Sequence, residues 1–370
     1  MVTLRDKVRG MLIGGAIGDA LGMPVETWSP SKILQVHPNG ITKYESPKNH
    51  KWFDPETMKS GMVTDDTQLT LATARGIINA VNKINRSEGF FSHEEREEIF
   101  SSIAQEHVSA MKGSVAGWGN TTKESIRRLA NGVYWKESGK TTEENRGGGN
   151  GVPMKCSPLS ALKLKLMLSS KYINFEEHLV DFSKMTHWTA ESADATIVHN
   201  NVMIQLLISE NFDERNFVKS LCADSWSRKC DSLTTGPLEI SQWTTRDLEG
   251  DQYKYKNTMR LISDLYELGK LHTIYVETIR DLFGNGNHLV WNSVPFSYMF
   301  FIRNPNSVDS ILDVINAGGD TDTNAKLVGE MLGALHGMKI FEENEWILKG
   351  LTIKDEVLTL ADEFCDVVGF

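Results

Sequence analysis

Glycine recurs at every fourth position near the start of the chain, at residues 10, 14, 18 and 22. In an α-helix this spacing places the glycines on one face, where a neighbouring helix can approach closely. Glycine lowers helix propensity, so close packing must compensate for it. The repeat therefore predicts a pair of helices in tight contact. Helical periods also dominate the rest of the chain, with no strand alternation, and we expect an all-α fold.

Several helix boundaries are predicted from local patterns. Ser92 and Glu95 have the spacing of a capping box, which predicts a helix start. Apolar periodicity predicts helices over residues 122–130, 190–208 and 259–282. Residues 29–60 contain four prolines and are expected to form a loop.

The composition is that of an ordinary globular protein. The 370 residues are 40% hydrophobic and 24% charged, which is ample material for a core. Length alone allows one domain or two. The formal net charge of −10, with 49 acidic against 39 basic residues, disfavours binding to the phosphate backbone of a nucleic acid. We therefore expect no nucleic-acid partner.

The sequence also argues against a membrane protein. Arg5, Lys7 and Arg9 precede a short apolar run and mimic the start of a signal peptide, but Asp19 soon interrupts the run. No apolar stretch approaches the roughly 18 residues that a membrane span requires. The four cysteines show no paired spacing, which is typical of a reducing compartment. We expect a cytoplasmic protein without a membrane partner.

Two acidic segments begin helical patterns at distant points of the chain. Residues 318–323 read Gly-Gly-Asp-Thr-Asp-Thr, and residues 64–67 read Thr-Asp-Asp-Thr. One explanation is that each segment is only an acidic helix cap favoured by the helix dipole. However, four carboxylates brought together would repel one another unless a cation neutralised them. Oxygen-only ligands select hard ions such as Mg2+, Mn2+ or Ca2+. The pair of segments therefore favours a metal site.

Two further motifs complete a set. Residues 18–26 read Gly-Asp-Ala-Leu-Gly-Met-Pro-Val-Glu, and residues 149–155 read Gly-Asn-Gly-Val-Pro-Met-Lys. With the two acidic segments, in this order and separation, they resemble the ADP-ribosylglycohydrolase family, which includes the ADP-ribosylarginine hydrolases and the dinitrogenase reductase-activating glycohydrolase. The resemblance covers nearly the whole chain, so we expect one domain over residues 1–370.

The resemblance implies an activity and its cofactors. The expected reaction hydrolyses the glycosidic bond between ADP-ribose and a modified protein side chain, with arginine as the first candidate, and passes through an oxocarbenium-like state. Two divalent cations, Mg2+ or alternatively Mn2+, would align the ribose and activate water. The implied catalytic residues are Glu26, Asp65 and Asp322, with Glu26 either an acid/base or a residue that gates the substrate. The implied metal ligands are Thr64, Asp65, Asp66, Asp320, Asp322 and Thr323.

The resemblance also implies substrate contacts. The loop that ends in Gly149-Asn150-Gly151 is rich in glycine, so its N–H groups can surround an anion such as the ADP-ribose pyrophosphate. The family usually has arginine where this chain has Lys155, which keeps the charge but loses the bidentate fork. The implied substrate-binding residues are Gly149, Asn150, Gly151, Met154, His187 and Trp118. Trp118 can stack on adenine or serve as a buried anchor. A single histidine is usually a structural residue, and only the resemblance to the family assigns His187 to the substrate site.

Several alternatives stay open. The linkage can instead be serine-linked ADP-ribose or O-acetyl-ADP-ribose. The chain can be a binding protein on a hydrolase fold, or an immunity protein whose partner is an ADP-ribosylating toxin. Residues 225–256 are polar and aperiodic and least resemble the family. They are expected to form a surface loop, or else a lid or partner-recognition element.

Overall fold

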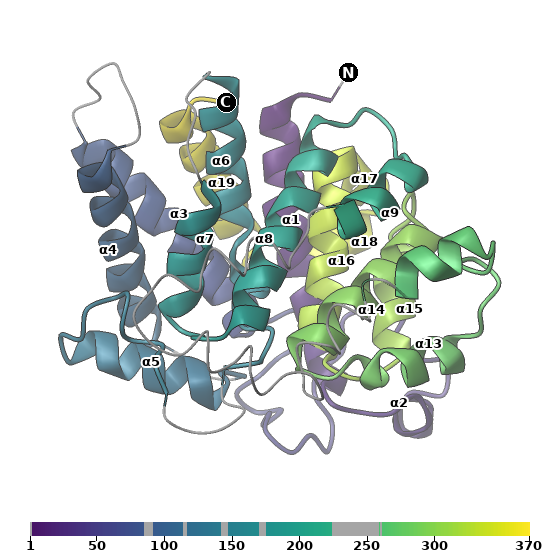
Figure 1. Cartoon of the computed structure of the whole chain (residues 1–370). Helices are drawn as coiled ribbons and strands as arrows, with labels where there is room; N and C mark the ends of the chain where they lie inside the picture. Colours follow the sequence, from purple (N-terminus) through teal and green to yellow (C-terminus); the bar gives the residue numbers. More distant parts are fainter. Residues whose placement is uncertain are drawn as a thin grey trace.

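Helices form the architecture of the protein, as the computed structural model in Figure 1 shows. The structure describes residues 2–84, 92–113, 117–141, 147–169, 175–223, 259 and 261–370. Within these ranges no strand forms, and an isolated bridge pairs Gly149 with Leu289. The predicted all-α class is confirmed. None of the described helices is both long and apolar enough to cross a membrane.

The helices and short 3-10 turns follow one another along the chain in this order: α1 (Leu4–Gly22), η1 (Met23–Val25), α2 (Pro30–Val36), α3 (Asp65–Lys83), α4 (His93–Ala110), α5 (Asn120–Ala130), η2 (Pro153–Lys155), α6 (Ser157–Leu168), α7 (Phe175–Lys184), α8 (Ala190–Ile208), α9 (Glu214–Ala223), α13 (Val276–Leu282), η3 (Gly284–Gly286), α14 (Val290–Arg303), α15 (Asp309–Asn316), α16 (Thr321–His336), α17 (Lys339–Glu342), α18 (Glu345–Lys349) and α19 (Lys354–Val368).

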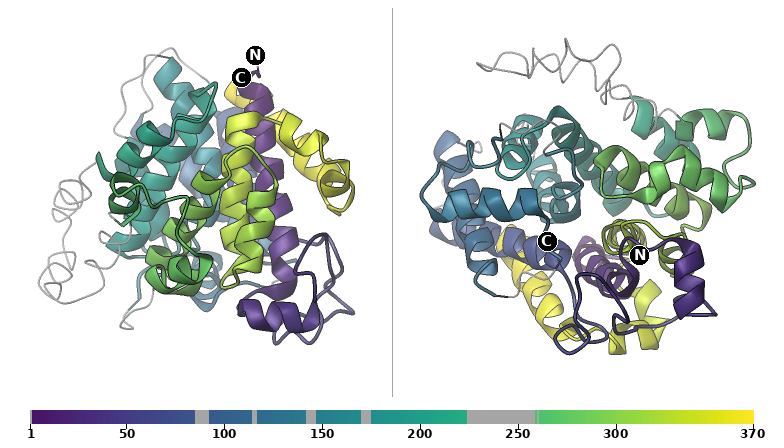
Figure 2. Two further views of the ribbon diagram at one scale, coloured as in Figure 1. Left: turned by 90° about the vertical axis from the view of Figure 1, so that its right-hand side faces the viewer. Right: turned by 90° about the horizontal axis from the view of Figure 1, so that it is seen from below.

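The first helix, α1, and the late helix α16 lie side by side through the middle of the molecule (Figures 1 and 2). The glycine repeat is what lets them touch. A Cβ added to any of the glycines at 10, 14, 18 and 22 would lie under 3.0 Å from backbone atoms of α16 or of Gly337, which follows it. Gly329 and Gly333 of α16 face the backbone of α1 in the same way. The tight helix pair expected from the sequence is therefore present.

The two helices run in opposite directions. Gly10 faces Gly337 at one end of the pair, and Gly22 faces Thr321 at the other. The Thr321 hydroxyl also donates to the carbonyl oxygen of Gly22 at 2.8 Å. As a result, the end of α1 meets the start of α16, where the second acidic segment lies.

A buried ion pair sits in the core beside this contact. The ammonium group of Lys326 bonds the carboxylate of Glu330 one turn later, and both side chains are at most 1% exposed. Glu330 also accepts a 2.6 Å hydrogen bond from Ser157 and lies 3.4 Å from Nε2 of His199. Burial alone would raise the pKa of Glu330, but Lys326 and His199 more than offset it, so this pKa lies below its usual value.

The local boundary predictions had mixed outcomes. The capping box at Ser92 is confirmed, because Ser92 and Glu95 exchange both hydrogen bonds at the start of α4. The expectation of a loop over 29–60 was wrong at α2, which Ser29 caps. The expectation of one helix over 259–282 was also wrong. The chain turns at Gly269, whose φ of +63° favours glycine, and helix resumes only at α13. Residues 225–256 lie outside the described ranges.

The glycine contact predicts a specific sensitivity to an added methyl group. We expect Gly18→Ala to destabilise the protein by about 3 kcal/mol, because overpacking forces the backbones of α1 and α16 apart. A matched control is Gly119→Ala, where nothing lies within 4 Å of the added Cβ and φ is −63°. Urea unfolding followed by circular dichroism measures both. Similar midpoints for the two variants would contradict the contact.

The buried ion pair makes a second prediction. We expect Glu330→Ala to cost about 3–5 kcal/mol, because the ammonium of Lys326 would remain buried without its partner. The double variant Lys326→Met with Glu330→Leu should recover most of that loss. The pair of Glu345 and Lys349 has the same four-residue spacing but is exposed, and Glu345→Ala should leave the unfolding midpoint unchanged. Equal effects of Glu330→Ala and Glu345→Ala in the same unfolding assay would argue against the core pair.

Candidate active site

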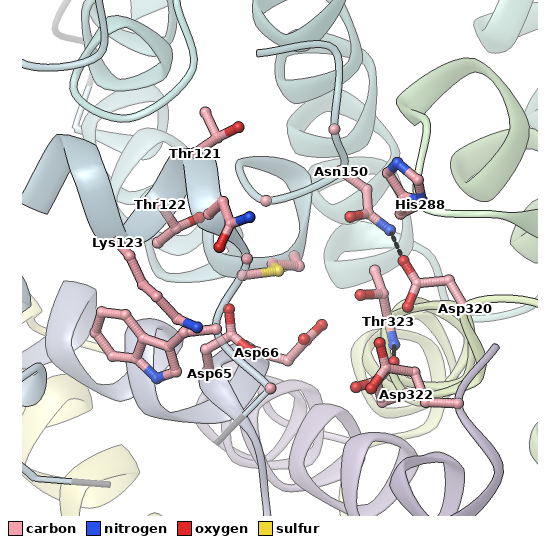
Figure 3. Close-up of a pocket in the computed structure, with 18 of the residues that line it drawn as sticks. Asp65, Asp66, Thr121, Thr122, Lys123, Asn150, His288, Asp320, Asp322 and Thr323 are labelled. Atoms are coloured by element: carbon pink, nitrogen blue, oxygen red, sulfur yellow. Dashed lines mark hydrogen bonds between the residues drawn. The ribbon is translucent and has the colours of Figure 1, made fainter. Parts of the chain in front are cut away.

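A cavity of about 830 Å3 opens where several helix ends converge. The starts of α3, α5 and α16 contribute to its wall, together with the glycine loop before η2 (Figure 3). Nearly every site residue expected from the sequence lines this cavity: Glu26, Asp65, Asp66, Trp118, Gly149, Asn150, Gly151, Met154, His187, Asp320, Asp322 and Thr323. Thr64 is the exception, since it is fully buried and does not reach the cavity lining.

The two acidic segments meet in this cavity. Carboxylate oxygens of Glu26, Asp320 and Asp322 all lie within 4.8 Å of one another. In Figure 3, Asp65 and Asp66 face Asp320 and Asp322 across the cavity. Segments some 250 residues apart in the chain therefore contribute carboxylates to one site.

Glu26 is held through its backbone. Its carbonyl oxygen accepts a 3.0 Å hydrogen bond from Nε2 of His50, whose ring stacks on Phe53 at 4.6 Å. The next residue, Thr27, has a φ of +63°, and its N–H donates to the carbonyl of Gly319 at 2.6 Å. Left-handed backbone is unfavourable for a β-branched residue and persists only where its surroundings enforce it. The turn after Glu26 is therefore fixed directly to the loop that precedes α16.

Asp320 is oriented by a network of neutral side chains. The carboxamide of Asn150 donates to Oδ2 of Asp320 at 2.8 Å and to the hydroxyl of Ser293 at 2.9 Å. The N–H of Asp320 donates to the carbonyl of Gly286 at 2.9 Å. The backbone N–H of Asn150 is also engaged, with the carbonyl of His288 at 2.9 Å. Asn150 thus orients an acidic residue, and its N–H is not free to surround an anion.

Asp19 holds the first acidic segment in place. Its carboxylate accepts hydrogen bonds from the N–H and hydroxyl of Thr64, at 3.1 and 2.8 Å, and from the N–H and hydroxyl of Thr67, at 3.0 and 2.6 Å. This role was missed in the sequence. The available signal was an acid in the middle of the apolar, glycine-rich helix α1, since a buried carboxylate needs partners.

The carboxylates that line the cavity are strongly perturbed. Burial, reinforced by the charges of neighbouring carboxylates, raises the pKa of Asp65 to about 7 and those of Glu26, Asp66 and Asp322 well above their usual values. Oε2 of Glu26 and Oδ1 of Asp66 are buried and have no hydrogen-bond partner among the described residues. A buried oxygen without a donor is costly, and a bound cation would remove that penalty.

The donor set fits a hard divalent cation. The converging ligand atoms of Glu26, Asp320 and Asp322 are carboxylate oxygens, and Asp65, Asp66 and Thr323 add further oxygens to the same lining. Oxygen ligands of this kind suit Mg2+, Mn2+ or Ca2+ better than zinc. The residues therefore form an acidic cluster that could hold metal.

The expected substrate contacts divide into two groups. Trp118 and Met154 are buried in a small apolar cluster, and Trp118 also donates from its indole to Gln68 at 2.8 Å. Trp118 is thus a buried anchor that also forms part of the cavity wall. His187 is 3% exposed and lies against the glycine loop. Lys155 is fully buried and does not belong to the lining.

Several lining residues were not predicted. Lys51 and Trp52 contribute from the loop before α3, and Trp52 is 52% exposed. Residues 120–123, the first turn of α5, and His288 also line it, as do Thr27, Gly117 and Gly119. The aromatic residues within 44–53 were the sequence signal for Lys51 and Trp52. The position of α5, in contrast, depends on tertiary packing.

Residues 1–369 of the chain match the ADP-ribosylglycohydrolase family. The chain belongs to this family. Its members hydrolyse ADP-ribose linkages, so this ADP-ribosylglycohydrolase is a hydrolase that acts on ADP-ribosylated substrates and releases ADP-ribose.

Individual relatives have low sequence identity to this chain but align with it over most of their length. The ADP-ribosyl-[dinitrogen reductase] glycohydrolase of Rhodospirillum rubrum is 22% identical, over 99% of this chain and 98% of that protein. The ADP-ribosylarginine hydrolase Tri1 of Serratia proteamaculans is 24% identical, over 97% of this chain and 78% of that protein. A solved ADP-ribosylglycohydrolase-related protein complex superposes over 100% of both chains with a TM-score of 0.61 at 18% identity, which confirms the fold.

The contrast between two buried acids predicts opposite effects of the same substitution. In chelator, we expect Asp66→Asn to raise the melting temperature, because it removes a repelled carboxylate with an unpartnered oxygen. Asp19→Asn should instead destabilise the protein by about 3 kcal/mol, because an amide cannot accept all the donors of Thr64 and Thr67. Added Mg2+ should stabilise the wild type and not Asp66→Asn. Thermal unfolding of the wild type and both variants, with and without Mg2+, measures these effects. Destabilisation by Asp66→Asn in chelator would contradict this account.

Proposed function

We propose that this chain removes ADP-ribose from modified arginine side chains of proteins, with two Mg2+ ions as cofactors. The observation that carries the proposal is the convergence of Glu26 and both acidic segments in one cavity, with buried carboxylate oxygens that lack hydrogen-bond donors. The name of the Serratia relative, an ADP-ribosylarginine hydrolase, supports arginine as the acceptor.

The proposed metal ligands come from the two acidic segments. Thr64 is included although its side chain does not reach the cavity lining, because its hydroxyl donates its proton to Asp19 at 2.8 Å and the oxygen keeps lone pairs for a cation. Mn2+ is the alternative ion. The full proposed set is Thr64, Asp65, Asp66, Asp320, Asp322 and Thr323.

Bound divalent cations would supply charge neutralisation, a hold on the ribose hydroxyls and a more acidic water. The residues of the chain supply the positioning. Asn150 aims Asp320 into the site, and the fixed turn at Thr27 keeps Glu26 beside Asp322. In this arrangement Glu26 is the proposed acid/base at the reacting bond, with Asp65 and Asp322 as the other catalytic residues. Substrate gating is the alternative role of Glu26.

The size and charge of the cavity also support the proposal. A volume of about 830 Å3 lies within the range of small-molecule sites, about 300–1,000 Å3. Lys51, Lys123 and the glycine loop also line the cavity, and the two ammonium groups suit a pyrophosphate. No described residue favours a toxin as a partner, and we do not propose one.

The proposal predicts a metal-dependent activity. Purified protein with Mg2+ should release free ADP-ribose from mono-ADP-ribosylated arginine, and chelator should abolish the release. Asp322→Ala should lower the rate at least about a hundredfold, because it removes charge stabilisation from the site. Glu345→Ala, at an exposed position, is the control. Undiminished activity in chelator and in Asp322→Ala would remove the metal mechanism.

A substrate panel tests the acceptor. Serine-linked ADP-ribose and O-acetyl-ADP-ribose are compared with the arginine linkage under the same conditions. Faster release of ADP-ribose from either compound would identify that linkage, and not the arginine linkage, as the substrate. The assignment of the protein as a hydrolase would stand. Mg2+ binding by calorimetry with no release from any member would favour a binding role for this fold.

A further inference from the structure

Three buried polar side chains connect the protein interior to the cavity. The ammonium of Lys155 donates to the hydroxyl of Thr186 at 2.7 Å, and that hydroxyl lies 3.0 Å from Nδ1 of His187. Lys155 and Thr186 are fully buried, and His187 is 3% exposed and lines the cavity. Lys155 itself does not reach the cavity, so its influence there passes through Thr186.

The hydrogen-bonding capacities of these groups determine which atom donates. A lysine ammonium only donates, so it takes one lone pair of the Thr186 oxygen. Among the described residues, Lys155 and His187 are the partners that the structure gives this hydroxyl. If Nδ1 of His187 carried the proton, the hydroxyl proton of Thr186 would be buried with no acceptor, which is costly. The hydroxyl therefore donates to Nδ1.

A neutral imidazole whose Nδ1 accepts must carry its proton on Nε2. The ring remains neutral, because burial and then the charge of Lys155 lower the pKa of His187 well below its usual value. Nε2 has no hydrogen-bond partner among the described residues, although the side chain is almost fully buried. This nitrogen is a polar atom available to a ligand.

The glycine loop is shaped around this ring. A Cβ on Gly151 would lie 2.6 Å from Cε1 and 2.9 Å from Nε2 of His187, so a larger residue would displace the imidazole. A Cβ on Gly149 would lie 3.5 Å from Nε2. Both glycines line the cavity with His187. Nε2 is therefore presented at the wall where the proposed function places the pyrophosphate.

We propose that Lys155 and Thr186 are positioning residues that fix His187 with its Nε2–H toward the cavity, as a neutral donor to an acceptor oxygen of the bound ligand. For the phosphate oxygens of ADP-ribose, this inference rests on the proposed function. The assignment of the His187 proton to Nε2 does not rest on the proposed function, because it depends only on the three side chains.

Nitrogen NMR of histidine labelled with 15N tests the tautomer directly. Spectra are recorded at about pH 6, because burial lowers the pKa of Lys155 to about 7 and the side chain must carry its proton. The His187 signals are assigned with His187→Gln. We expect a protonated Nε2 and an unprotonated Nδ1 in the wild type, and a protonated Nδ1 would overturn the inference whether or not any variant folds.

Two matched pairs of variants test the positioning residues. Thr186→Ser and Lys155→Arg retain the hydroxyl and the donor-only cation, and should keep the Nε2–H tautomer. Thr186→Val and Lys155→Met remove them, and should yield a mixture of tautomers or Nδ1–H. The Nε2–H tautomer retained in both of the latter variants would overturn the role of Lys155 and Thr186.

Calorimetry with ADP-ribose tests the donor. We expect Thr186→Val to weaken ADP-ribose binding about tenfold relative to Thr186→Ser, as the loss of one oriented hydrogen bond would. Equal affinities would overturn the donor role. A wild type that shows the expected tautomer but binds no ADP-ribose would remove the proposed function and leave the tautomer assignment standing, so the two failures are distinguishable.

Discussion

The backbone contact between α1 and α16 is the constraint on which the site depends. Its glycine repeat alone does not fix the register, because sliding one helix by a turn would again place small residues opposite one another. Two contacts at the ends remove this ambiguity. The Thr321 hydroxyl bonds the carbonyl of Gly22, and the N–H of Met338 bonds Asp6 at 3.1 Å. With the register fixed, Glu26 beyond α1 and Asp322 in the first turn of α16 must lie together.

The buried acids in and around the site fall into two kinds. Asp19 and Glu330 are surrounded by donors or a cation, and each holds elements of the fold together. Glu26 and Asp66 instead keep a buried oxygen without any donor among the described residues. Satisfied carboxylates serve the structure, whereas unsatisfied ones are a destabilising feature that a fold retains only where a ligand completes them.

Features with a local signal could be predicted from the sequence. Spacing within a few residues was enough to predict the glycine repeat, the capping box at Ser92, the helix over 190–208 and the acidic segments. Interactions between distant segments could not. Nothing near Asn150 indicates that its amide would orient Asp320, and nothing near Lys155 indicates Thr186, because tertiary packing creates both contacts. The short helix α2 was hidden by the prolines around it, one of which occupies its first position.

The distribution of charge within the cavity constrains how an extended ligand can lie. Figure 3 draws Thr121 and Thr122, in the uncapped first turn of α5, above Asp65 and Asp66. Free N–H groups at a helix start favour anions, whereas clustered carboxylates repel them. For ADP-ribose, we infer that the phosphates lie toward α5 and the glycine loop, with the terminal ribose over the acids. The reverse orientation would bring two phosphate charges close to the carboxylates, so this distribution of charge favours the orientation with the scissile bond toward the acids.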